Sequence, residues 1–344
     1  MPVAAPRADF GDTAVALDIH LPFSYWRERD FDHGGPAIRP NDALVARYTK
    51  ALMAEIASLG ADVGCGGETA GSQQAEAEGA DASGPGAADA GDAGAADAAA
   101  PRRIVGSVFF SGGYLGLLYP DDFRDILRAV RRNFHVTERL AVEAATFPGS
   151  VDMYAASAYL DEHVGALMFE LPTLSGRESR DLGLPNALQA LDKTLNVLGS
   201  YGAGEFGLRL PVDVPGRTAE TWRYLLGQIN HYRPVHVEFV ALGTPEEQAA
   251  ALADEGLAGL RSALATQGYR EVAPDFMTRA DTTPAFVAER MARKAAGRSH
   301  EYLGVGLGAQ TLTDGFWTKN TTDLQRYLAC SDDYRTLIEA VREV

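Results

Sequence analysis

Segments of strand and helix character alternate along most of this 344-residue chain. Six apolar runs have the length and composition of buried strands, namely residues 15–21, 104–110, 140–145, 166–171, 205–210 and 235–242. Each is followed by a segment with helical periodicity, namely residues 43–59, 121–133, 150–163, 186–198, 219–230 and 245–266. Because right-handed β-α-β crossovers place parallel strands inside a layer of helices, the alternation predicts an α/β fold, a TIM-type partial (β/α)6 barrel.

Composition divides the chain into four parts. Residues 1–60 form the first βα unit, residues 102–267 the remaining units, and residues 268–344 a short α+β C-terminal extension. In this extension we expect a strand at 269–277 and helices at 284–296 and 332–341. Residues 61–101 are an insert of Ala, Gly, Asp and Glu with almost no large apolar side chains. Such a segment cannot bury enough surface to offset the entropy of ordering, so the sequence predicts a disordered acidic insert.

Charge and composition exclude several classes of protein. A formal charge of −16 argues against nucleic-acid binding, which requires a basic surface. No apolar run approaches the ~20 residues of a membrane-spanning helix, so no membrane span is expected. The chain has only two cysteines and no recognisable secretory signal. Both features favour a reducing compartment, and we expect a cytoplasmic protein.

The end of the first predicted strand carries the most distinctive residues. Residues 17–24 read L-D-I-H-L-P-F-S, and a loop rich in acidic and aromatic side chains follows. Pro22 cannot donate a hydrogen bond and should end the strand. In a barrel of parallel strands, a loop at this position lies on the face where ligand sites are normally built.

These residues resemble the opening of a known family, the radical S-adenosylmethionine (SAM) proteins that comprise oxygen-independent coproporphyrinogen III oxidases and haem chaperones. That family reads aromatic-Ile-His-Ile-Pro-Phe-Cys here and continues as C-x3-C-x2-C. Its three thiolates hold a [4Fe-4S] cluster, which binds SAM through its free iron. In this sequence the three cluster positions are Ser24, Glu28 and Phe31, and none is a thiol.

The resemblance continues through five further segments. They are residues 110–118 (FSGGYLGLL), 142–144 (VEA), 214–222 (VPGRTAETW), 233–237 (RPVHV) and 302–309 (YLGVGLGA). The resemblance therefore implies a partial barrel of the radical SAM kind. It also implies which residues line a former SAM pocket: Asp18, His20, Gly112, Gly113, Glu143, Pro172 and Arg209.

Several of these positions differ from the family pattern. Asp18 stands where the family has an aromatic residue, Pro172 where it has a SAM-contacting Gln, and Arg209 where it has an acid. Gly112, Gly113 and Glu143 are kept. We expect Glu143 and Arg209 to form an inward-facing ion pair in place of the cofactor.

The loop after the first strand leaves two further interpretations open. Tyr25 and Trp26 could stack on a planar ligand such as a porphyrin, or pack against the barrel. Asp30, Asp32 and His33 could hold a metal ion, although acids in a loop are more often solvated.

The sequence therefore predicts a pseudoenzyme without catalytic residues, a cluster, SAM or a bound metal. We expect a cytoplasmic protein that binds a small molecule, a tetrapyrrole such as haem, or a protein partner. The alternative is an enzyme with non-radical metal-dependent or acid–base chemistry at the barrel mouth. Perturbed titratable groups converging at the mouth would favour the enzyme, and an apolar cleft would favour the binding protein.

Overall fold

The computed structural model describes residues 14–24, 37–62, 104–112, 115–181, 186–203, 205–214, 217–241, 245–296 and 300–343. The predicted acidic insert at 61–101 lies almost wholly outside these residues. So do the aromatic and acidic loop positions that follow Ser24.

A single twelve-stranded sheet organises the described residues. Its centre holds six parallel strands in sequence order: β1 (Ala14–His20), β2 (Ile104–Ser111), β3 (His135–Thr146), β4 (Val164–Glu170), β5 (Gly207–Pro211) and β6 (His236–Val240). Helices follow these strands in turn: α1 (Asp42–Asp62), α2 (Pro120–Asn133), α3 (Met153–Asp161), α4 (Gly176–Asp181), α5 (Ala187–Ser200), α6 (Ala219–Tyr232), α7 (Pro245–Leu252) and α8 (Glu255–Ala265). The predicted partial barrel is confirmed, and its sheet does not close.

The C-terminal residues extend the sheet at both edges. Strands β7 (Arg270–Ala273) and β8 (Phe276–Thr278) form a hairpin beside β6. At the other edge, β9 (Tyr302–Val305) pairs with β1 in parallel. The antiparallel strands β10 (Gln310–Thr313), β11 (Phe316–Asn320) and β12 (Ile338–Glu343) follow, with the short helices α10 (Leu324–Cys330) and α11 (Tyr334–Leu337) between β11 and β12.

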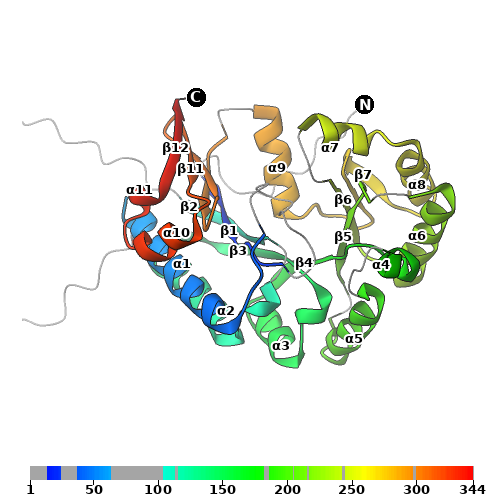
Figure 1. Ribbon diagram of the computed structural model, residues 1–344, viewed down its shortest axis with the longest axis horizontal. Coiled ribbons are helices and arrows are strands. Elements are labelled where there is room, and N and C mark those ends of the chain that lie inside the picture. The colour runs from blue at the N-terminus through cyan, green and yellow to red at the C-terminus, as the bar shows by residue number, and fades with distance from the viewer. Residues whose placement is uncertain are drawn as a thin grey trace, which may run out of the picture.

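Alternation of side chains along the strands gives the sheet two different sides. On the outer side, apolar residues such as Leu17, Val108 and Leu208 pack with the surrounding helices into one large core. Figure 1 shows these helices arranged around the convex side of the sheet. The inner side carries buried polar residues such as Asp18 and Glu143, together with a smaller apolar cluster.

Helix α9 (Ala285–Ala296) lies on the inner, concave side of the sheet, opposite the other long helices (Figure 1). Phe286 and Val287 of its first turns form a second apolar cluster with Ala145, Met168 and Phe276. The ring of Phe286 also stacks on Phe109 of β2, with ring centroids 4.5 Å apart. The concave face of the partial barrel is therefore partly filled by the chain itself.

Three predicted elements were wrong in detail. The single strand expected at 269–277 is the antiparallel hairpin of β7 and β8, because the chain turns between Ala273 and Phe276. The helix expected at 245–266 is broken into α7 and α8, because Asp254 caps the start of α8 by accepting a hydrogen bond from the Leu257 amide. The terminal helix expected at 332–341 is only the four-residue α11, and residues from Ile338 onward form β12 against β11. Pairing with a distant strand overrides the local helical pattern there.

None of the described helices combines the length and apolar character that crossing a membrane requires.

Candidate functional site

The inner face of the sheet presents a row of polar and charged side chains. Asp18, Glu143, Arg209 and Glu238 all face the concave side, from β1, β3, β5 and β6. Each is at most 9% exposed. Buried charges need partners, so the contacts of these residues decide what the concave face can do.

Glu143 is held by the first turn of α9. The backbone amides of Ala285 and Phe286 donate hydrogen bonds to its two carboxylate oxygens, each at 2.7 Å. A helix N-terminus has unpaired amides and a partial positive charge, so a carboxylate is a suitable partner. Burial raises the pKa of Glu143 to about 7, and the two amide donors lower it in part.

Arg209 lies between two buried acids. Its Nε is 2.9 Å from Glu238 Oε2, and its Nη1 is 3.6 Å from Glu170 Oε2. Glu238 also pairs with Arg290 of α9, which in turn lies 3.3 Å from Asp275. The expected ion pair between Glu143 and Arg209 was wrong, because β4 separates their strands and each residue has other partners.

The other candidate SAM-pocket residues lie near the carboxyl ends of the strands. His20 ends β1, and its Nδ1 is 3.3 Å from the Ser111 hydroxyl. Gly112 follows β2 with a φ of +88°, and a Cβ there would lie 2.1 Å from the Leu21 carbonyl oxygen. Pro172 is buried just after β4. Gly113 lies outside the described residues.

The loop after β1 is described only at its ends. Ser24 is buried, and its backbone amide donates to the Ile38 carbonyl. The remaining candidates in this loop lie outside the described residues: Tyr25, Trp26, Glu28, Asp30, Phe31, Asp32 and His33. Among the residues that the structure does describe, no group of three or more His, Cys, Asp or Glu side chains could hold a metal ion.

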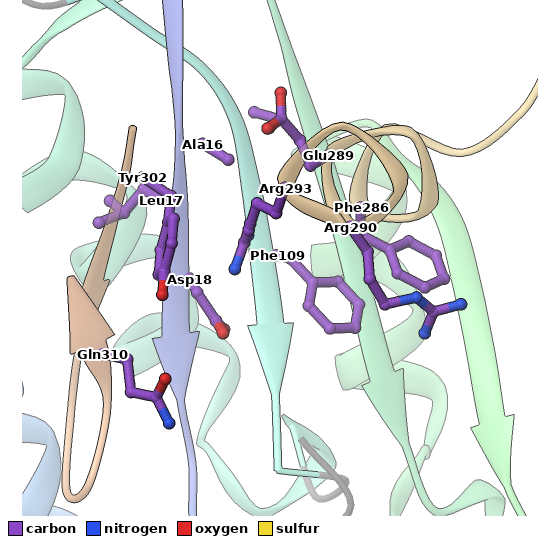
Figure 2. A pocket seen from close by; sticks show the side chains of 11 residues that line it. Ala16, Leu17, Asp18, Phe109, Phe286, Glu289, Arg290, Arg293, Tyr302 and Gln310 are labelled. Atoms are coloured by element: carbon purple, nitrogen blue, oxygen red, sulfur yellow. The ribbon is translucent and has the colours of Figure 1, made fainter. Parts of the chain in front are cut away.

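A pocket of about 190 Å³ remains on the concave face between α9 and strands β1, β2 and β9. Figure 2 shows Arg293 extending from α9 between Tyr302 and Phe109, with Asp18 and Gln310 beside it. The Arg293 guanidinium lies over the Tyr302 ring, 4.0 Å from the centroid. Sequence reasoning identified Asp18 but missed Arg293, whose place on the concave face depends on how α9 packs.

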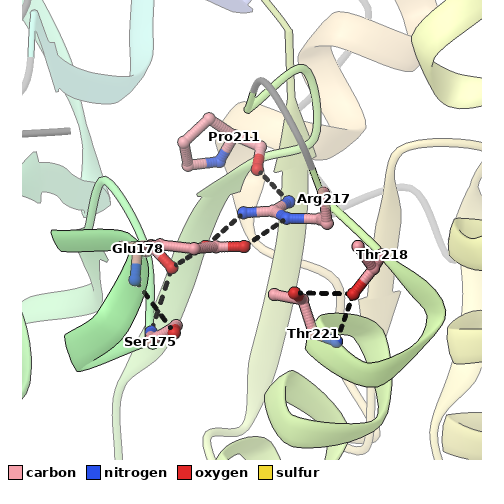
Figure 3. Close-up of polar contacts among 7 residues, drawn as sticks. Ser175, Glu178, Pro211, Arg217, Thr218 and Thr221 are labelled. Carbon is pink, nitrogen blue, oxygen red and sulfur yellow. Dashed lines mark hydrogen bonds and ion pairs between the residues drawn. The ribbon is translucent and has the colours of Figure 1, made fainter. Parts of the chain in front are cut away.

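A second cavity, of about 650 Å³, lies between α4 and α6. Glu178 lines this cavity, and Arg217 donates to it from Nε and Nη2 at 3.4 and 3.3 Å, and to the Pro211 carbonyl from Nη1 at 2.7 Å (Figure 3). The Thr173 hydroxyl also donates to Glu178. Because Arg217 and Glu178 are nearly buried and satisfied by each other, this cluster joins the ends of β4 and β5 and needs no ligand.

Comparison with known proteins identifies the fold. No protein-family model matches the chain, and no curated protein matches its sequence. Among solved structures, coproporphyrinogen III oxidase (HemN) from Escherichia coli, described as a radical SAM enzyme, superposes with a TM-score of 0.70. The match covers 98% of this chain and 73% of that one at 16% identity. This chain has the coproporphyrinogen III oxidase fold.

The resemblance seen in the sequence motifs is thus confirmed for the fold. A structure of anSMEcpe with bound AdoMet also matches, with a TM-score of only 0.44 and 12% identity. The match covers 94% of this chain and 82% of the anSMEcpe chain.

The described residues do not fit the cofactors that the coproporphyrinogen oxidase fold would imply. Ser24 occupies a position where the resemblance expects a cluster thiolate, and the other two positions carry Glu28 and Phe31. The carboxylate of Glu143 is taken by amides of α9, and Arg209 is held between acids.

Proposed function

We propose that this protein is a cytoplasmic pseudoenzyme on the coproporphyrinogen III oxidase fold, one that binds a small molecule on its concave face. The observation that carries this proposal is the contact between Glu143 and the first turn of α9. In the family that the sequence resembles, the acid at the position of Glu143 contacts SAM. In this chain the first turn of α9 contacts Glu143 instead.

The size of the remaining pocket favours a small ligand over a tetrapyrrole. Pockets for drug-sized ligands usually have volumes of about 300–1,000 Å³. The pocket beside Asp18 and Arg293 has about 190 Å³. Haem therefore exceeds the space that α9 leaves, whereas a ligand of a few non-hydrogen atoms fits.

Anaerobic reconstitution with iron and sulfide tests the absence of radical chemistry. The wild-type protein should show no broad iron–sulfur absorption and should not cleave added SAM. A variant with Ser24→Cys, Glu28→Cys and Phe31→Cys supplies the matched control, because it restores three thiolates. Cluster formation with SAM cleavage by the wild-type protein would overturn the proposal.

Titration with haem tests the ligand size. We expect no change in the Soret band of haem when the wild-type protein is added. A saturable Soret shift would contradict the small-ligand part of the proposal and would assign a tetrapyrrole to this protein.

A further inference from the structure

We propose that the pocket between α9, β1 and β9 binds a free amino acid, with its carboxylate on Arg293 and its ammonium group facing Asp18. This inference rests on the proposed function, because it requires the concave face to be a site for a small ligand. It adds the chemical class of that ligand.

The guanidinium of Arg293 is the first reason. Its Nε is buried and makes no hydrogen bond within the described part of the chain. A buried donor without an acceptor is costly, so a ligand that supplies one gains that energy on binding. Stacking over Tyr302 fixes the plane of the guanidinium, and its N–H edge matches the geometry of a carboxylate.

The other charges of the pocket already have partners. Arg290 pairs with Glu238 and Asp275, on the side of α9 away from Arg293 in Figure 2. Glu289 is 2.6 Å from His300 Nε2. Arg293 is therefore the cation of this pocket with which an anionic group of a ligand would pair.

Asp18 restricts which anion can bind. Its carboxylate lines the same pocket and is 9% exposed. A simple anion on Arg293 would be repelled by this carboxylate at short range. A ligand that carries an ammonium group beside its carboxylate converts that repulsion into attraction, since a carboxylate can accept several hydrogen bonds. The opposite charges of Arg293 and Asp18 thus match those of an amino acid.

The walls and the volume set the rest of the ligand. Phe109 and Phe286 stack against each other along one side and offer an apolar surface to a side chain. A volume of about 190 Å³ accommodates a small or medium amino acid and excludes a nucleoside.

Calorimetric titration with separated halves of one amino acid tests the inference. The probes are L-alanine, propionate (which lacks the amine) and ethylamine (which lacks the carboxylate), with L-leucine and L-phenylalanine as a size series. We expect at least one of the amino acids to bind saturably, and L-alanine to bind more tightly than either of its halves.

Arg293→Gln should weaken amino-acid binding about tenfold or more, and Arg293→Lys should recover part of it. Arg177→Gln, on the exposed surface of α4, is the matched control and should bind normally.

Asp18→Asn gives the more specific readout. It should weaken alanine binding and strengthen propionate binding, because the repulsion disappears. The inference fails if no amino acid binds, if propionate binds as well as alanine to the wild-type protein, or if Arg293→Gln has no effect. Such a failure without cluster formation leaves the proposed pseudoenzyme intact, whereas cluster formation with SAM cleavage overturns the proposed function itself.

Discussion

The backbone amide of Phe286 donates a hydrogen bond of 2.7 Å to the Oε2 of Glu143. These residues are 143 positions apart, and the bond joins the first turn of α9 to the centre of β3. It places a helix of the C-terminal extension on the concave face of the sheet. Helix α9 therefore limits how much of the concave face stays accessible.

Glu143→Gln should weaken the docking of α9. A glutamine can accept only one of the two amide hydrogen bonds and turns its own amide group toward the other buried donor. We expect the free energy of unfolding to fall by about 1–3 kcal/mol. Urea denaturation measures this change. Glu220→Gln, in the exposed first turn of α6, is the control and should change stability by less than about 0.5 kcal/mol. Equal effects of the two substitutions would contradict the account.

Stability should decrease as the pH rises toward neutrality. Glu55 of α1 is fully buried and accepts hydrogen bonds from the Gly306 amide, the Tyr327 hydroxyl and the Asn320 side chain. Burial raises its pKa from 4.5 to about 7, with the three donors lowering it in part. The folded protein therefore keeps a proton that the unfolded chain releases. The stabilising contribution is complete below pH 4.5 and is lost as the pH rises to about 7.

The expected loss from Glu55 is about 3 kcal/mol at most. Glu143 contributes with the same sign, because its pKa is also raised to about 7. Urea denaturation between pH 5 and pH 8 measures the slope, and Glu55→Gln should flatten it. An unchanged slope in that variant would show that Glu55 does not titrate in this range.

Arg209→Met should be strongly destabilising. It would leave the buried carboxylates of Glu170 and Glu238 without the cation between them. Removing one partner of a buried ion pair typically costs 3–5 kcal/mol, so we expect a loss of about that size. Arg177→Met removes an exposed ion pair on α4 and should cost less than about 1 kcal/mol. Thermal denaturation of both variants makes the comparison, and a small effect at Arg209 would contradict the described network.

Two glycine substitutions should have opposite effects. Gly112→Ala places a Cβ 2.1 Å from the Leu21 carbonyl oxygen at a φ of +88°, and should cost more than about 2 kcal/mol. Gly227→Ala lies within α6, where the Cβ meets nothing within 4 Å, and should stabilise by about 1 kcal/mol. Chemical denaturation distinguishes the two signs. A neutral Gly112→Ala would show that the turn after β2 is not as tight as described.

The central sheet was predictable from sequence because its strands are apolar on their outer side and bounded by turn residues. The positions of β1 to β6 follow from that pattern within a few residues. The C-terminal strands were harder to predict. Ile338 and its neighbours have a local pattern compatible with a helix, and only pairing with β11 makes them a strand.

The candidate site was less predictable than the fold. Asp18, Glu143 and Arg209 were identified because the family resemblance places them in a former SAM pocket. Their partners come from α9, β4 and β6, and sequence spacing alone does not reveal which elements meet across the concave face. Helix α9 differs from an outer helix in where its arginines lie. An outer helix would turn its arginines toward water, whereas Arg290 of α9 pairs with the buried Glu238.

Hydrogen–deuterium exchange in the Ala285–Ala296 helix is the most direct test of the central claim that α9 is docked on Glu143. The amides of its first turn should exchange slowly in the wild-type protein, because those of Ala285 and Phe286 are bonded to a buried carboxylate. In Glu143→Gln the same amides should exchange faster, while those of α1 stay unchanged. Rapid exchange along α9 in the wild-type protein would contradict the account and would mean that the concave face is open.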